Sequence, residues 1–141
     1  MTNSDCQITL VFASHTPEIL DLATIFEGLV VNKWATGESI GDKTHTYNLI
    51  RLELGDGNYA SALHSTETWL EQHSKTISKY VSLSYGAGVA ISTFFQISDQ
   101  FGRQTISPHG QSIRVPLSLI SFCHEHHLEF MFSADAKLVA G

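Results

Sequence analysis

The sequence predicts an α+β fold: a mixed or antiparallel sheet of about five strands, ferredoxin-like, with helices on one face. Segments with an apolar residue at every second position alternate along the chain with segments whose apolar residues are three and four apart. These are the periods of strands and helices. Their order gives strand–helix–strand halves that resemble split βαβ units. Hydrophobic residues make up 43% of the chain, which is enough for a folded core.

The length of 141 residues indicates one domain. Surface scaling implies that roughly two thirds of the unfolded chain's surface is buried on folding, so no disulfide or metal is needed. We expect the folded core to span residues 6–133 and the tail, residues 134–141, to be frayed.

The first third of the chain predicts a strand, a helix and a long loop. Residues 7–14 alternate as a buried strand does. Thr16, Pro17 and Glu18 form a helix start, with a capping hydroxyl, a proline in the first turn and an acid beside the positive helix end. The helix continues to about residue 29. Residues 32–46 are polar and irregular, which indicates a loop with a short strand at most at its start.

The rest of the chain repeats the alternation. A strand at 47–54 and a turn at 55–58 are followed by a helix at 59–72 and a shorter helix after Ser74, which the glycines at 86–88 end. We then expect a strand at 89–98, a polar loop at 99–111 and a short strand at 112–115. A helix that Pro116 opens and a last strand at 128–133 complete the chain. One core is expected from their large apolar residues: Phe12, Phe26, Leu52, Trp69, Ile91, Phe95, Ile120 and Phe130.

The charge balance limits the function. Lys and Arg number 8 against 14 Asp and Glu, so the net charge is −6. Such a chain is a poor ligand for nucleic acid and a better one for a basic protein. No secretory signal or apolar run of about 18 residues occurs, which predicts a cytoplasmic protein without a membrane segment. Cys6 and Cys123 are far apart in sequence, and we expect two reduced, partly buried thiols.

Signatures of catalysis and cofactor binding are absent from the sequence. Gly86 and Gly88 resemble the first glycines of a dinucleotide fingerprint, but they precede a strand, not a helix. The carboxylates are scattered, and no nucleophile stands beside a base in a known motif. The sequence therefore predicts no catalytic residue, no cofactor and no enzymatic activity.

The histidines around Glu125 are the one cluster with metal-binding chemistry. On a helix, His124 and His127 lie on one face, and a metal would need a third ligand such as Glu129 or His109. The simplest explanation is a polar helix end, where imidazoles lie against the negative end of the helix dipole. A contact patch that changes charge between about pH 6 and 7 is a further alternative. We predict that no metal binds here.

Trp34 lies in the irregular segment, where neither a helical nor a strand period accounts for it. It is either an anchor that packs back onto the core or an exposed anchor for a partner, since Trp is enriched at the centres of interfaces. An acidic protein that captures a basic one presents carboxylates around such an anchor. The candidate binding residues are therefore Trp34, Glu38, Asp42, Asp56, Glu67 and Glu71.

Several of these segments, taken in order, resemble a family of bacterial domains of unknown function. The matching pieces are the strand at 8–12, Pro17-Glu18-Ile19, the Trp-x-x-Gly-Glu motif at Trp34–Glu38, the helix at 63–70, the strand at 89–97, Leu117-Ser118-Leu119 and residues 128–132. The resemblance covers residues 6–133. It implies a small cytosolic accessory protein, and for some members an immunity partner of a secreted toxin, with no catalytic residue carried over.

Three functions follow as hypotheses. The first is a binding protein that neutralises a basic partner, either a toxin such as a nuclease or, as a phage-encoded inhibitor would, a nucleic-acid machine. The second is a small metal-dependent enzyme that uses His124 and His127. The third is a self-associating module in which an exposed sheet edge or face forms a homodimer.

Overall fold

The principal sheet of the computed structural model has six strands in the order β2-β5-β1-β6-β7, and β8 also pairs with β6. The structure describes the backbone of residues 6–100, 103–106 and 115–140, and the side chains of residues 6–94 and 115–134. All pairings in this sheet are antiparallel except that of β6 with β8, which is parallel. The predicted α+β class with a mixed sheet is confirmed.

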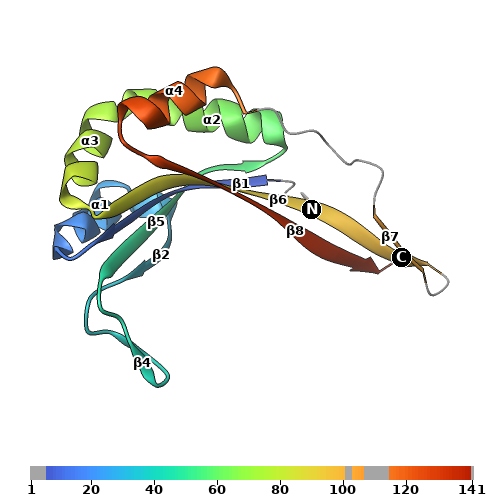
Figure 1. Ribbon diagram of the computed structural model, residues 1–141, viewed down its shortest axis with the longest axis horizontal. Coiled ribbons are helices and arrows are strands. Elements are labelled where there is room, and N and C mark those ends of the chain that lie inside the picture. The colour runs from blue at the N-terminus through green and yellow to red at the C-terminus, as the bar shows by residue number, and fades with distance from the viewer. Residues whose placement is uncertain (1–5, 101–102, 107–114, 141) are drawn as a thin grey trace.

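The strands and helices follow one another along the chain as in Figure 1. They are β1 (Cys6–Ser14), the 3-10 helix η1 (Pro17–Asp21), α1 (Leu22–Ile25), the 3-10 helix η2 (Glu27–Leu29), β2 (Val30–Trp34), β3 (Ser39–Ile40), β4 (Lys43–Thr44), β5 (Asn48–Gly57), α2 (Tyr59–Gln72), α3 (Ser74–Leu83), β6 (Gly86–Gln100), β7 (Arg103–Ile106), α4 (Leu117–Glu125) and β8 (Glu129–Ala140).

The core lies between the sheet and the layer formed by α2, α3 and α4, which cover one face (Figure 1). Leu10 of β1 stands opposite Leu52 of β5 on one side and Val89 of β6 on the other, and all three side chains are buried. Along β1, the residues at positions 6, 8, 10, 12 and 14 are buried. Burial at every second position is the strand period that the sequence shows. The central position of β1 therefore follows from its apolar sequence.

The helical connections divide into two kinds. β5 and β6 flank β1 and run parallel to each other, so that β5, the pair α2–α3 and β6 form a split βαβ unit. In contrast, β6 and β8 are direct neighbours joined through α4, as in an ordinary βαβ crossover. Because only the first unit is split, the ferredoxin-like arrangement is not confirmed.

The predicted helix after β1 is broken into three short pieces. Its start is as expected, since the Thr16 side chain accepts a hydrogen bond from the Glu18 backbone N–H at 3.4 Å and Pro17 follows the cap. Phe26, with φ −122° and ψ 50°, then leaves the helical conformation. Its ring packs edge-on against Trp69 at 4.8 Å, so a contact with α2 accompanies the end of the regular helix.

The segment 32–46 is more regular than expected. Its first residues belong to β2, which pairs with β5, and the following strands β3 and β4 form a two-stranded hairpin that projects from the sheet (Figure 1). Gly37 and Gly41 have φ values of +94° and +60°, which glycine adopts readily. The long loop of the sequence prediction is thus largely a hairpin.

β5 continues through the predicted turn at 55–58. Gly55 lies inside the strand, opposite Ile8, and a Cβ at this position would be 2.4 Å from the carbonyl oxygen of Ala62 on α2. The glycine is therefore required by close packing between strand and helix. Asn58 then caps α2, accepting a hydrogen bond from the Ser61 N–H at 2.8 Å.

β6 begins three residues earlier than expected. Gly86 and Gly88, which the sequence predicts to end the preceding helix, pair with Ala13 and Val11 of β1. β7 lies within the predicted loop at 99–111 and pairs with the end of β6. The predicted strand at 112–115 falls mostly outside the described residues, and Val115 is not in a strand.

The tail predicted to fray continues β8 as far as Ala140. Residues from Ala134 to Ala140 pair in parallel with residues from Thr93 to Asp99 of β6. The backbone hydrogen bonds of this ladder supply an order that the side-chain pattern alone did not predict.

The expected core is correct for five residues. Phe12, Leu52 and Ile91 are fully buried, and Phe26 and Trp69 are partly buried against the same core. Each of them belongs to a segment whose period was clear in the sequence.

Two residues of the expected core are wrong. Ile120 is 46% exposed, because α4 turns Leu119 and Cys123 toward the sheet and leaves Ile120 on another side. Phe130 is 37% exposed because it lies on β8, which forms an edge of the sheet among the described residues. The side chain of Phe95 lies outside the described residues.

Candidate functional site

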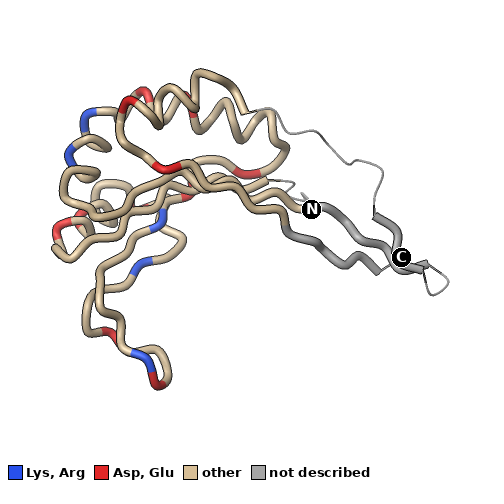
Figure 2. Tube along the Cα trace, in the orientation of Figure 1, with Lys and Arg blue, Asp and Glu red and all other residues tan. Residues whose placement is uncertain are grey.

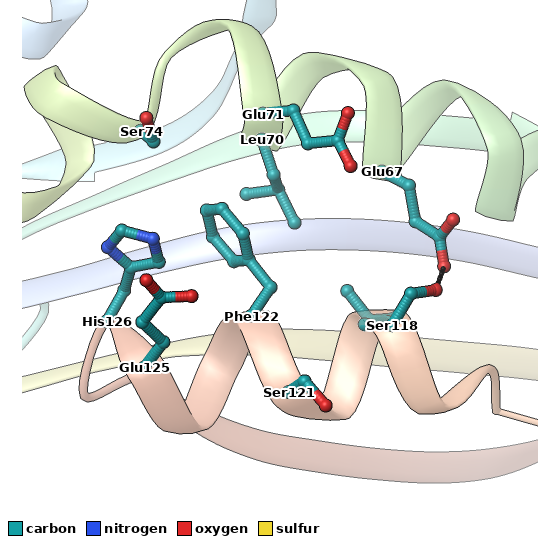
Figure 3. A pocket seen from close by; sticks show the side chains of 10 residues that line it. Glu67, Leu70, Glu71, Ser74, Ser118, Ser121, Phe122, Glu125 and His126 are labelled. Carbon is teal, nitrogen blue, oxygen red and sulfur yellow. Dashed lines mark hydrogen bonds between the residues drawn. The ribbon is translucent and has the colours of Figure 1, made fainter.

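A groove of about 330 Å³ lies between α2 and α4, close to the start of α3 (Figure 3). α2 contributes Glu67 and Glu71, which are one helical turn apart and therefore share a face. α4 contributes Ser118, Phe122 and Glu125, spaced four and three residues apart. The groove is thus built from one face of each helix.

The floor of the groove is apolar. Leu70 of α2 and Leu119 of α4 are buried, and both belong to the core beneath the helices. The half-buried ring of Phe122 lies between the two helices and faces α2 (Figure 3). A ligand in the groove would therefore rest on carbon atoms that the fold itself holds in place.

Two side-chain hydrogen bonds join α4 to the neighbouring helices at the groove. The Ser118 hydroxyl donates to Glu67 Oε1 at 2.9 Å (Figure 3). Toward the other end of α4, Ser78 Oγ and His126 Nδ1 are 2.9 Å apart, which ties α4 to α3. These hydrogen bonds orient Glu67 and His126. The carboxylates of Glu71 and Glu125 have no side-chain hydrogen bond of this kind within the described part of the chain.

The charge of the groove is negative. Glu67, Glu71 and Glu125 line it, and no Lys or Arg is part of the lining. Lys75 and Lys79 of α3 are not part of the lining, and Figure 2 shows basic positions on α3 but none along α2 and α4. Carboxylates beside an apolar floor match a cation on an aliphatic stem, because the stem covers carbon while the charge meets oxygen.

The structure separates the predicted binding residues into distinct places. Glu67 and Glu71 come together in the groove. Glu38 and Asp42 are exposed on the projecting segment that carries β3 and β4. Asp56 is exposed near the end of β5. The acidic residues therefore do not form one continuous site.

Trp34 packs at the base of the hairpin. Its ring stacks on His45 with a centroid distance of 4.3 Å and an interplanar angle of 13°, and Tyr47 meets it edge-on at 5.7 Å. The ring is half-buried. Trp34 Nε1 and His45 Nε2 are buried without a hydrogen-bond partner among the described residues. These contacts give Trp34 a structural role in holding the hairpin.

The histidines do not form a metal centre with the residues that are described. His124 and His127 are exposed, and His126 is engaged with Ser78. In the described ranges no three His, Cys, Asp or Glu side chains are placed to hold a metal ion. Of the third ligands considered, Glu129 is exposed and His109 lies outside the described residues.

The groove residues on or next to α4 that were not predicted as binding residues include Ser118, Phe122, Glu125 and His126. Their spacing along α4 was visible in the sequence and indicated one face of a helix. What the sequence did not show is that this face lies against Glu67 and Glu71 of α2, since that contact depends on the tertiary fold.

Both cysteines are buried, and neither forms a disulfide. Burial raises the pKa of the Cys123 thiol from 9.0 to about 11, because a thiolate is poorly solvated inside the protein. The pKa of Tyr59 is raised as well, chiefly by burial and secondarily by Cys6. A thiol with a raised pKa is a weak nucleophile.

None of the helices in the described ranges combines the length and the apolar character that a membrane span requires. Comparison of the chain with family models, with curated proteins and with solved structures finds no match.

Proposed function

We propose that this protein is a binding module of the immunity or inhibitor type, which neutralises a basic protein by binding it and without catalysis. The observation that carries the proposal is the acidic groove between α2 and α4. Glu67, Glu71 and Glu125 surround an apolar floor there, and no Lys or Arg in the lining offsets their charge. A Lys or Arg side chain of the partner fits such a groove.

The charge of the whole chain supports a basic partner. A net charge of −6 accelerates encounter with a positively charged protein and disfavours contact with nucleic acid itself. The partner is then a toxin, a nuclease for example, or a component of a nucleic-acid machine. The resemblance of the Trp34–Glu38 segment to a family with immunity proteins supports the toxin.

The place of action that we propose is the cytoplasm. Cys6 and Cys123 form no disulfide, which is consistent with a reducing compartment. An inhibitor of a nuclease or of a nucleic-acid machine has to meet its partner where nucleic acid is handled, which agrees with this location.

The proposal is tested by titrating the purified product of the neighbouring gene, which we expect to be a basic protein, against wild type and Glu71→Gln. Glutamine keeps the size of the side chain and removes its charge. We expect Glu71→Gln to weaken binding by about 1–2 kcal/mol, as the loss of one charge at an interface does. Glu27→Gln, which makes the same charge change outside the groove lining, serves as the matched control and should bind as wild type does.

The variant Asp42→Asn distinguishes a partner bound at the groove from a partner bound at the hairpin. If Asp42→Asn weakens binding as much as Glu71→Gln does, the contact surface includes the hairpin and the groove alone is an insufficient account. If the basic protein does not bind the wild type at low salt, the immunity proposal is wrong.

A further inference from the structure

β8 is an edge strand over its whole length. It pairs with β6 from Glu129 to Ala140, and within the described part of the chain no strand lies on its other side. β6 and β8 extend together beyond the part of the sheet that the helices cover (Figure 1). A long free edge presents a row of N–H and C=O groups that match another strand.

Apolar side chains accompany this edge. Phe130, Met131 and Phe132 are 37%, 40% and 49% exposed, and Leu117 and Ile120 of α4 are 76% and 46% exposed. Phe130 and Phe132 stand beside Val89 and Ile91 in the strand register, which places them on the helix-covered side of the sheet together with α4. Exposed apolar surface next to a free strand edge is typical of an interface.

The hydrogen bonds of Ser133 show which backbone N–H and C=O groups of β8 point to the free edge. Thr93 Oγ1 donates a hydrogen bond to the Ser133 carbonyl at 3.3 Å, and Ser133 Oγ donates to Ser92 Oγ at 3.1 Å, so Ser133 faces β6. Because successive residues of a strand direct their N–H and C=O groups to opposite sides, those of Phe132 and Ala134 point to the free edge.

We propose that β8 pairs antiparallel with β8 of a second copy of this chain, around a two-fold axis at Ser133. This inference is independent of the groove and of the partner proposed for it. A two-fold axis perpendicular to the sheet keeps each face continuous and places both copies of α4 on the same side. Each strand then meets an identical strand through the outward groups of Phe132 and Ala134.

The order of charges along β8 selects this register. Glu129 and Lys137 lie four residues on either side of Ser133, so that each acid stands opposite the lysine of the other copy. Centres at residues 131, 132 and 134 place Glu129 opposite Ser133, Asp135 and Val139 instead. A centre at Ala136 places Asp135 opposite Lys137 but leaves Phe130 with no opposite residue. The centre at Ser133 is the one of these registers that both pairs opposite charges, which stabilise cross-strand pairs, and covers Phe130.

Residue sizes agree with the same register. Centred on Ser133, Phe132 stands opposite Ala134 and Phe130 opposite Ala136 of the other copy. A large residue therefore meets a small one at each of these positions. The second copy is thus a self-complementary occupant of the edge.

The test is sedimentation equilibrium of wild type, Glu129→Lys and Lys137→Glu. We expect a wild-type dimer at micromolar concentration, with twice the 15.5 kDa of the chain. Each single variant opposes two like charges at both ends of the interface and should raise the dissociation constant at least about tenfold. Glu27→Lys and Lys79→Glu change the net charge equally away from β8 and should dimerise as wild type does.

Mixing the two single variants gives the sharpest result. In a mixed dimer, the lysine introduced at position 129 of one chain meets the glutamate introduced at position 137 of the other, while the unchanged Lys137 meets the unchanged Glu129. The mixture should therefore regain the wild-type dissociation constant, which also shows that both variants are folded. Two results overturn the proposal: a wild type that stays monomeric at about 200 micromolar, where a micromolar dimer is almost fully formed, or a mixture that associates no more tightly than its components.

Discussion

Ser118 donates a hydrogen bond to Glu67 across the groove, and through this 2.9 Å contact the first turn of α4 is joined to the middle of α2. The bond holds one of the three groove carboxylates in place. Glu71 has no such bond within the described residues and is available to a ligand. The groove therefore has one fixed acid and others that are open to a cation.

Gly55→Ala should destabilise the protein by about 1–3 kcal/mol, the usual cost of an added methyl group in a tightly packed place. The new Cβ would lie 2.4 Å from the Ala62 carbonyl oxygen and 2.9 Å from Thr66 Oγ1. Gly28→Ala is the matched control, because no atom lies within 4 Å of its Cβ position. Urea unfolding measures both. Equal stability of the two variants would mean that α2 does not pack on β5 as described.

Phe12→Ala should lower the free energy of unfolding by about 3–5 kcal/mol, as other large-to-small changes in cores do. Phe12 of β1 is fully buried. Ile120→Ala, at a side chain 46% exposed, should cost less than about 1 kcal/mol. Guanidinium unfolding of the two variants tests the orientation of α4. A large loss for Ile120→Ala would place that residue in the core after all.

The sequence predicted most elements with a strong period, and β1, α2, α3 and α4 lie within a few residues of the expected ranges. It failed where a tertiary contact decides the structure. The helix ends at Phe26, whose ring packs on Trp69, and Gly55 is a strand residue that α2 approaches closely. Neither contact can be read from local periodicity.

Two residues of the groove, Glu67 and Glu71, were among the carboxylates that the sequence suggested for their charge. Trp34 and the hairpin acids, which the structure places elsewhere, were grouped with them. Charge and spacing predict which residues are exposed on one element. They do not predict which elements are neighbours, and so Glu125 of α4 was missed.

Trp34→Ala should loosen the hairpin and lower stability by about 1–3 kcal/mol, since stacking and burial of a large aromatic ring are lost. Trp34 stacks on His45 and contacts Tyr47. Trp34→Phe keeps a ring in the stack and removes Nε1, which is buried without a partner among the described residues, so it should retain most of the stability. Thermal melts compare the variants, with binding of the basic protein measured on each folded one. An unchanged melting temperature for Trp34→Ala would contradict the structural role.

The stability should fall as the pH rises from about 9 to 11. The pKa of Cys123 is raised to about 11 in the folded protein, against 9.0 for an ordinary thiol. Between these values the unfolded chain loses the proton and the folded chain keeps it, so unfolding becomes more favourable as the pH increases. Below about pH 9 the contribution is fully present. Urea unfolding at several pH values should show a smaller decline for Cys123→Ala, while Tyr59 still titrates in both proteins. Identical declines would contradict burial of the thiol.

The central claim is that the groove between α2 and α4 binds a basic side chain, and an NMR titration tests it most directly. The probe is N-acetyl-arginine amide, and the neutral, similarly shaped N-acetyl-citrulline amide is its control. We predict that the arginine probe shifts the backbone amide signals of the groove segments on α2 and α4 in the wild type. The shifts should be lost with citrulline and in the Glu67→Gln/Glu71→Gln variant. Shifts centred on the hairpin around Glu38 and Asp42, or equal shifts with citrulline, would contradict the claim.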